Sequence, residues 1–255
     1  MIGWVARRAA AALLLTIIGS AVLVLLVQWL PGDPLATIIG DRGLAPAAEA
    51  ALRAQWGVDK PALVVLVDFF RGLLHGDLGV SFIEQRPVRE LLVERLGPTM
   101  LLGGCTLLID FTIGAALGLW SALRPETLRA RLIAAATLCC YALPGFVIGL
   151  VLVWRFAVSW PLLPAGGFAD PLLAADAGAG AVLFDRLRHL ALPLATMVLA
   201  TIAVPIRMQR AAAAETRDAM WVTAARARGT QSALLAWRHI WRPALTPVVT
   251  LLGLW

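Results

Sequence analysis

The feature that most constrains this chain is an uninterrupted apolar run over residues 9–30. At a rise of 1.5 Å per residue, a helix of this length reaches roughly 33 Å, enough to cross a hydrocarbon core of about 30 Å. A secretory signal is the competing interpretation, because Arg7 and Arg8 precede the run. The run exceeds the usual signal core and ends without a small-residue cleavage pattern, so we predict a retained transmembrane helix.

The composition of the whole chain also indicates a membrane protein. Hydrophobic residues make up 60% of the sequence and charged residues 15%, whereas soluble domains are about half apolar and about one quarter charged. The net charge of +6 does not favour nucleic acid, because the basic residues lie between apolar blocks and form no stripe with interleaved aromatics. We therefore expect the basic residues to interact with the lipid bilayer and expect no nucleic-acid partner.

Further apolar segments predict additional spans, which gives an all-α membrane protein with a polytopic helical bundle. The complete spans are expected at residues 9–30, 98–123, 132–153 and 190–206. A last apolar segment, 243–255, would reach only some 18 Å as a helix, so we expect a partial span and a C-terminus that is truncated. Residues 1–255 would then form a single transmembrane domain.

The distribution of arginine predicts the orientation of these spans. Basic residues kept in short loops mark the cytoplasmic side, and they gather before the first span, between 124 and 131, and over 207–242. The N-terminus is therefore predicted to be cytoplasmic. Residues 31–97 and 160–185 would face outward. Because helices are indicated at 46–56 and 62–74, we expect an outer helical cap in the first of these segments.

Signatures of catalysis and metal binding are missing from the sequence. Lys60 is the only lysine and lies outside any phosphate-binding loop. The three histidines do not form a zinc-protease pattern, and Cys105, Cys139 and Cys140 are expected to be small buried hydrophobes. We predict a protein that is not an enzyme and that holds no cofactor or metal.

Two residues within the apolar segments are candidates for a translocation pathway. Asp110 lies in the middle of the second span, where a carboxylate must either line a polar path or be accommodated by a hydrogen bond between helices. Pro144, like Pro193 and Pro205, can kink a span or start one. Both alternatives remain open for each residue.

The segment 207–242 carries the most specific pattern in the chain. Strong helix formers precede Gly229, which lies where a helix C-cap requires a positive φ, and a second helical run follows. We predict a helix, a sharp turn and another helix in the cytoplasm. A solvated basic loop that holds anionic lipid headgroups is the alternative.

The residues of this segment resemble the cytoplasmic coupling loop of ABC importer permeases, in particular those of the binding-protein-dependent dipeptide, oligopeptide and nickel family. That loop carries two small residues, three positions and then a glycine, which here fall on Ala224, Ala225 and Gly229. Thr223 takes the place of a glutamate found in other branches. Further similarities follow in the family's order: Pro31-Gly32-Asp33-Pro34, Gly76-Asp77-Leu78-Gly79, Leu143-Pro144-Gly145-Phe146, Leu163-Pro164-Ala165-Gly166-Gly167 and Leu187-Arg188-His189-Leu190.

The resemblance implies six spans and a set of partners. A separate nucleotide-binding subunit would hydrolyse ATP, a second homologous permease would complete the pathway, and an extracytoplasmic solute-binding protein would deliver the substrate. Ala224 and Ala225 would allow close approach to the ATPase subunit, Gly229 would form the turn, and Arg226 and Arg228 would pair with acidic groups.

The expected function is that of a permease subunit in the cell inner membrane for peptides or for nickel and metal chelates. An ion-coupled secondary transporter is one alternative, and it would need no ATPase. A non-transporting membrane scaffold is the other, and deletion of it would leave substrate uptake normal.

Overall fold

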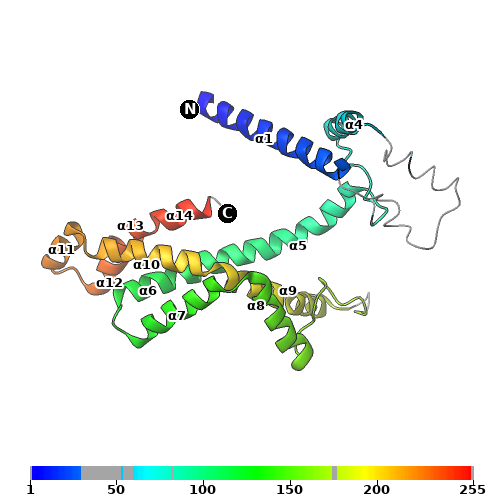
Figure 1. Cartoon of the computed structure of the whole chain (residues 1–255). Coiled ribbons are helices and arrows are strands. Elements are labelled where there is room, and N and C mark those ends of the chain that lie inside the picture. Colours follow the sequence, from blue (N-terminus) through cyan, green and yellow to red (C-terminus); the bar gives the residue numbers. More distant parts are fainter. Residues whose placement is uncertain (1, 30–52, 54–59, 82, 174–176, 254–255) are drawn as a thin grey trace. The chain divides into compact units, whose positions relative to one another are not determined.

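The computed structural model describes residues 2–29, 53, 60–81, 83–173 and 177–253. The chain divides into two compact units, Met1–Leu96 and Gly97–Trp255. Every named element in the described part is a helix, which confirms the predicted all-α class (Figure 1).

The first unit contains helices α1 (Ile2–Trp29) and α4 (Ala62–Leu74), which contact each other. Helix α4 has the bounds predicted for the amphipathic helix of the outer cap. Lys60 donates to Asp68 at 2.8 Å, and this contact lowers the pKa of that carboxyl. The other helix expected in the cap, at 46–56, lies outside the described residues apart from Arg53.

Among the described residues, three helices are long and apolar enough to cross a membrane, namely Gly3–Leu26, Val88–Leu123 and Ala179–Arg217, and a bent helix pair would make a fourth span. The three helices contain most or all of the spans predicted at 9–30, 98–123 and 190–206, and the last two begin about ten residues earlier than expected. Pro98 and Pro193 do not start these helices but lie inside them. Each proline removes one backbone hydrogen bond without ending its helix.

The third predicted span, 132–153, differs from a single straight helix. It comprises parts of α7 (Leu128–Ala142) and α8 (Gly145–Val153), and the pair that continues to Ser159 is bent by 100°. Leu143 is extended, with φ −88° and ψ 130°, because the ring of Pro144 disfavours the helical region for the residue before it. Pro144 then caps α8, so it both ends one helix and starts the next.

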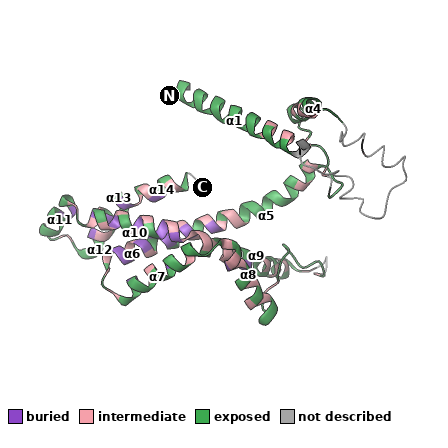
Figure 2. Ribbon diagram, viewed as in Figure 1, coloured by how far each residue is buried: buried purple, intermediate pink, exposed green. Residues whose placement is uncertain are grey.

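The second unit is built around a close contact between α6 (Ala115–Leu123) and α10 (Ala203–Arg217). A Cβ atom at Gly118 would lie 2.6 Å from the Ile206 carbonyl oxygen, and one at Gly114 would lie 3.1 Å from Pro205. Small residues four apart let helix backbones approach in this way. Figure 2 shows buried residues gathered along these two helices.

The helices α6 and α10 run in the same direction. Position 114 faces Pro205, position 118 faces Gln209, and Ala122 accepts a hydrogen bond from Arg217. A π-helical turn, η2 (Asp110–Gly114), joins α5 (Val88–Ile109) to α6. A second glycine pair repeats the pattern, since positions 145 and 149 of α8 face Ala200 and Thr196 of α9 (Ala179–Thr201).

A polar contact lies at the junction of α5, η2 and α9. Asp110 has no exposed surface, and Thr201 Oγ1 donates to its Oδ2 at 2.5 Å. The other carboxyl oxygen has no hydrogen-bond partner within the described part of the chain. Asp110 is therefore hydrogen-bonded between helices, and its place on a translocation pathway stays a prediction.

Alanine at Gly118 should destabilise the protein, although alanine is the better helix former. Its Cβ would overlap the α10 backbone, and overpacking of this kind costs about 1–3 kcal/mol. The matched control is Gly104→Ala on α5, where a Cβ meets nothing within 4 Å and the helix gains about 0.5–1 kcal/mol. Thermal unfolding in detergent measures both, and a Gly118→Ala variant as stable as the control would contradict the close contact.

Replacing Thr201 with valine should destabilise the helix junction by about 1–3 kcal/mol, because it leaves Asp110 without its described hydrogen-bond donor. Thr250→Val is the control, since that hydroxyl donates to Thr246 of its own helix. Chemical denaturation in detergent measures the difference. Equal effects of the two substitutions would show that the bond to Asp110 contributes nothing.

Candidate functional site

The helical stretch predicted at 211–228 is divided in the structure, because α10 ends at Arg217 and a new helix begins at Met220. The predicted turn and second helix follow. Helix α11 (Met220–Ala227) is followed by α12 (Ser232–Leu234) and the π-helical η4 (Leu235–Trp241). Gly229 has φ +82°, as the sequence predicts. Its N–H donates to the Arg226 carbonyl at 3.0 Å, and the N–H of Thr230 donates to the Ala225 carbonyl at 3.2 Å. This is a Schellman C-cap, which satisfies the last carbonyls of α11.

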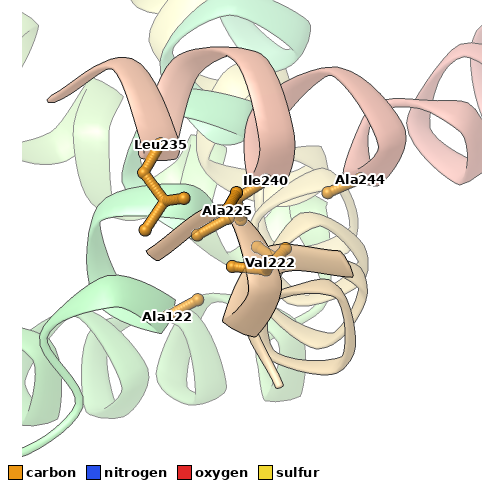
Figure 3. Packing of buried hydrophobic residues seen from close by; sticks show 7 residues of the cluster. Ala122, Val222, Ala225, Leu235, Ile240 and Ala244 are labelled. Atoms are coloured by element: carbon orange, nitrogen blue, oxygen red, sulfur yellow. The ribbon is translucent and has the colours of Figure 1, made fainter. Parts of the chain in front are cut away.

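One face of α11 packs inside the chain. Val222 and Ala225 are buried among Leu235, Ile240 and Ala244 of the following helices and Ala122 at the end of α6 (Figure 3). Ala225 keeps only 1% of its surface exposed. Its small size therefore serves packing within this chain, whereas the sequence suggested contact with a partner.

The other face of α11 is open. Met220 and Trp221 are 87% and 57% exposed, and Ala224 and Arg228 continue the exposed stripe at helical spacing. Arg226 is also exposed. Neither Arg226 nor Arg228 makes an ion pair with a described residue. The result is a short apolar surface with basic residues at its C-terminal end, which suits a protein partner with an apolar groove and acidic rim.

Arg217 ties this segment to the membrane helices. Its Nη1 donates to the carbonyl oxygen of Ala122 at 2.8 Å, so the last turn of α10 is bonded to the end of α6. Its Nε donates to Asp218 at 3.1 Å, which lowers the pKa of that carboxyl. The sequence identified Arg217 only as one of the cytoplasmic charges. Its place in the last turn of a helix, where basic side chains meet free carbonyls, was the available signal.

The two pathway candidates lie apart from the α11 surface but close to the same turn of α9. Asp110 bonds to Thr201, and a Cβ at Gly145, next to Pro144, would lie 3.3 Å from Ala200. Pro144 is exposed, whereas Asp110 is not. The glycine pairs at 114/118 and 145/149 that create these contacts were overlooked in the sequence, although four-residue spacing of glycines in apolar helices is a recognised signal.

No group of three potential metal ligands occurs within the described residues. The cysteines also differ from the sequence expectation. Cys139 is exposed, and Cys105 and Cys140 are half-buried. They lie on helix faces that the described residues leave partly or fully uncovered, because a membrane protein turns apolar side chains outward to lipid or to other subunits.

Comparison with known proteins gives two family matches that together cover almost the entire chain. Residues 114–254 match the binding-protein-dependent transport system inner membrane component, and residues 1–103 match the N-terminal region of such membrane components. The first match includes the whole α6, α10 and α11 arrangement.

Three relatives have names that refer to peptides. The dipeptide transport system permease protein DppB of Escherichia coli K12 is 29% identical over 89% of this chain and 72% of its own length. A putative peptide permease protein of Brucella ovis is 34% identical over 89% of this chain and 70% of its own. The di/tripeptide transport system permease protein DppB of Pseudomonas aeruginosa is 31% identical over 100% of this chain and 79% of its own.

The coverage of these matches, together with the all-helical fold and its membrane-spanning helices, confirms the resemblance seen in the sequence. The chain belongs to the family of inner membrane components of binding-protein-dependent transport systems, and it is a multi-pass ABC importer permease of the peptide type.

Proposed function

We propose that this permease passes peptides across the inner membrane in an ATP-driven importer and receives the driving motion through α11. The observation that carries the proposal is the exposed face of α11. This face has an apolar stripe and the exposed Arg226 and Arg228, and the helix is fixed to α6 and α10 by buried contacts. A separate nucleotide-binding subunit binds this face and hydrolyses ATP. Ala224 permits close approach of that subunit, and Gly229 forms the turn behind it.

Motion of α11 is transmitted because the segment has its own core. Val222 and Ala225 are packed against Ala122, and Arg217 bonds to the same turn of α6. A displacement of α11 by the ATPase subunit therefore moves α6 and α10 with it as a rigid body. A second, homologous permease completes the pathway, and a solute-binding protein delivers substrate on the outer side.

Peptides are the favoured substrate class. The three relatives compared above are named for peptides, dipeptides or di/tripeptides. Nickel and metal chelates remain the alternative class, because the family resemblance includes them. An ion-coupled carrier would leave the α11 surface without a role. A scaffold would not need to move as a rigid body, so the two glycine-mediated helix contacts would have no function in it.

The coupling role is tested with Ala224→Trp in the complete transporter. The indole would hold the two surfaces apart, so we expect loss of ATPase co-purification and at least a tenfold drop in dipeptide uptake. Ala224 suits the test better than Ala225, since a large side chain at the buried Ala225 would disrupt this chain itself. Ala181→Trp, at an exposed position near the start of α9, is the matched control. Wild-type association in the Ala224 variant would refute the proposal.

The orientation proposed from arginine places the N-terminus, Gly229 and the exposed α11 face in the cytoplasm. After replacement of the three native cysteines with alanine, Thr230→Cys should react with a membrane-impermeant maleimide only in permeabilised cells. Asp170→Cys, at an exposed position between α8 and α9, should react in intact cells. The reverse pattern of labelling would overturn the orientation while leaving the fold unaffected.

A further inference from the structure

A groove of about 440 Å³ lies between α7 and α10 and is separate from the α11 surface. Its α7 wall is mostly apolar and includes Ile133 and Leu138. Its α10 wall carries Arg207, Arg210 and Ala214, which share one face of the helix because they are three and four residues apart. The groove therefore combines an apolar wall with two cations spaced one turn apart.

Neither of these arginines has an acidic partner in the described part of the chain. No described ion pair involves Arg207 or Arg210. The guanidinium carbon of Arg207 lies 5.1 Å from the centre of the Tyr141 ring. Stacking on an aromatic ring holds the guanidinium in place but does not neutralise it. Both arginines follow the apolar segment 190–206 on the long helix Ala179–Arg217, where the span predicted from the sequence ends and lipid headgroups begin. The groove therefore offers an anionic ligand two cations that have no acidic partner among the described residues.

We propose that an anionic phospholipid occupies this groove, with its phosphate on Arg207 and Arg210 and its acyl chain against Ile133 and Leu138. Guanidinium groups bind phosphate oxygens through paired, charge-assisted hydrogen bonds. The apolar wall suits hydrocarbon. A neighbouring apolar helix from a second permease would cover the wall but would not supply the anion. Under the orientation proposed above, the site lies toward the cytoplasmic leaflet, where basic pockets between helices hold anionic headgroups.

The test uses the permease purified in dodecyl maltoside and native mass spectrometry with phosphatidylglycerol, phosphatidylcholine or glycerol phosphate. We expect phosphatidylglycerol to bind at least tenfold more tightly than either of the others, since it alone has both the net charge and the chains. Arg207→Gln combined with Arg210→Gln should weaken its binding about tenfold or more. This measurement requires neither transport nor an ATPase, so its failure is distinguishable from failure of the proposed function.

Two further variants keep the test decisive if the double substitution unfolds the protein. Ala211→Trp fills the groove from an exposed position of α10 and leaves both charges in place, so it should weaken lipid binding as well. Arg129→Gln removes an exposed charge from α7 outside the groove and should have no effect. The proposal would be overturned if phosphatidylcholine or glycerol phosphate bound as tightly as phosphatidylglycerol. It would also be overturned if phosphatidylglycerol bound undiminished to both the double variant and Ala211→Trp.

Discussion

The close approach of α6 and α10 at Gly118 is the contact on which the rest of the second unit depends. In a bilayer, apolar side chains gain little by leaving lipid for another helix, so association depends on close packing and on polar contacts. The absence of a side chain at Gly118 brings the Ile206 carbonyl to within 2.6 Å of the place where a Cβ atom would lie. At this separation the two helices are held in register along their whole length, from Gly114 opposite Pro205 to Ala122 opposite Arg217.

This register determines where the segment after α10 lies. Because α6 and α10 end side by side, Ala122 and Ala213 pack together against Val222, Ala225 and the helices after the turn. Arg217 adds a directional bond at the same level. The turn at Gly229 then folds the chain back so that Leu235 and Ile240 close the small core. The open face of α11 is thereby connected to two membrane helices by buried contacts, and no flexible linker intervenes.

The sequence predicted the features that depend on neighbouring residues along the chain. It was less informative about features that depend on contacts between distant segments. The positive φ of Gly229 and the helix at 62–74 follow from capping and periodicity, and both are observed. The role of Ala225 could not be read locally, because a small residue suits an internal contact and an external one equally. For Pro144 the sequence left a kink and a helix start open, because hydropathy continues across a proline even where the helix does not, and the structure shows the chain bent there. For Asp110, the deciding contact is with Thr201, 91 residues away in the sequence.

The arginines that predicted the orientation of the spans divide into three physical roles. Arg217 is bonded to backbone and carboxyl oxygens of its own chain and stabilises the end of α10. Arg226 and Arg228 lie exposed beside an apolar stripe, where a protein surface can meet them. Arg207 and Arg210 line a groove whose opposite wall is mostly apolar, a combination that fits an amphiphilic anion. Charge alone predicts the orientation of the spans, and the neighbours of each guanidinium decide whether it can face protein or lipid.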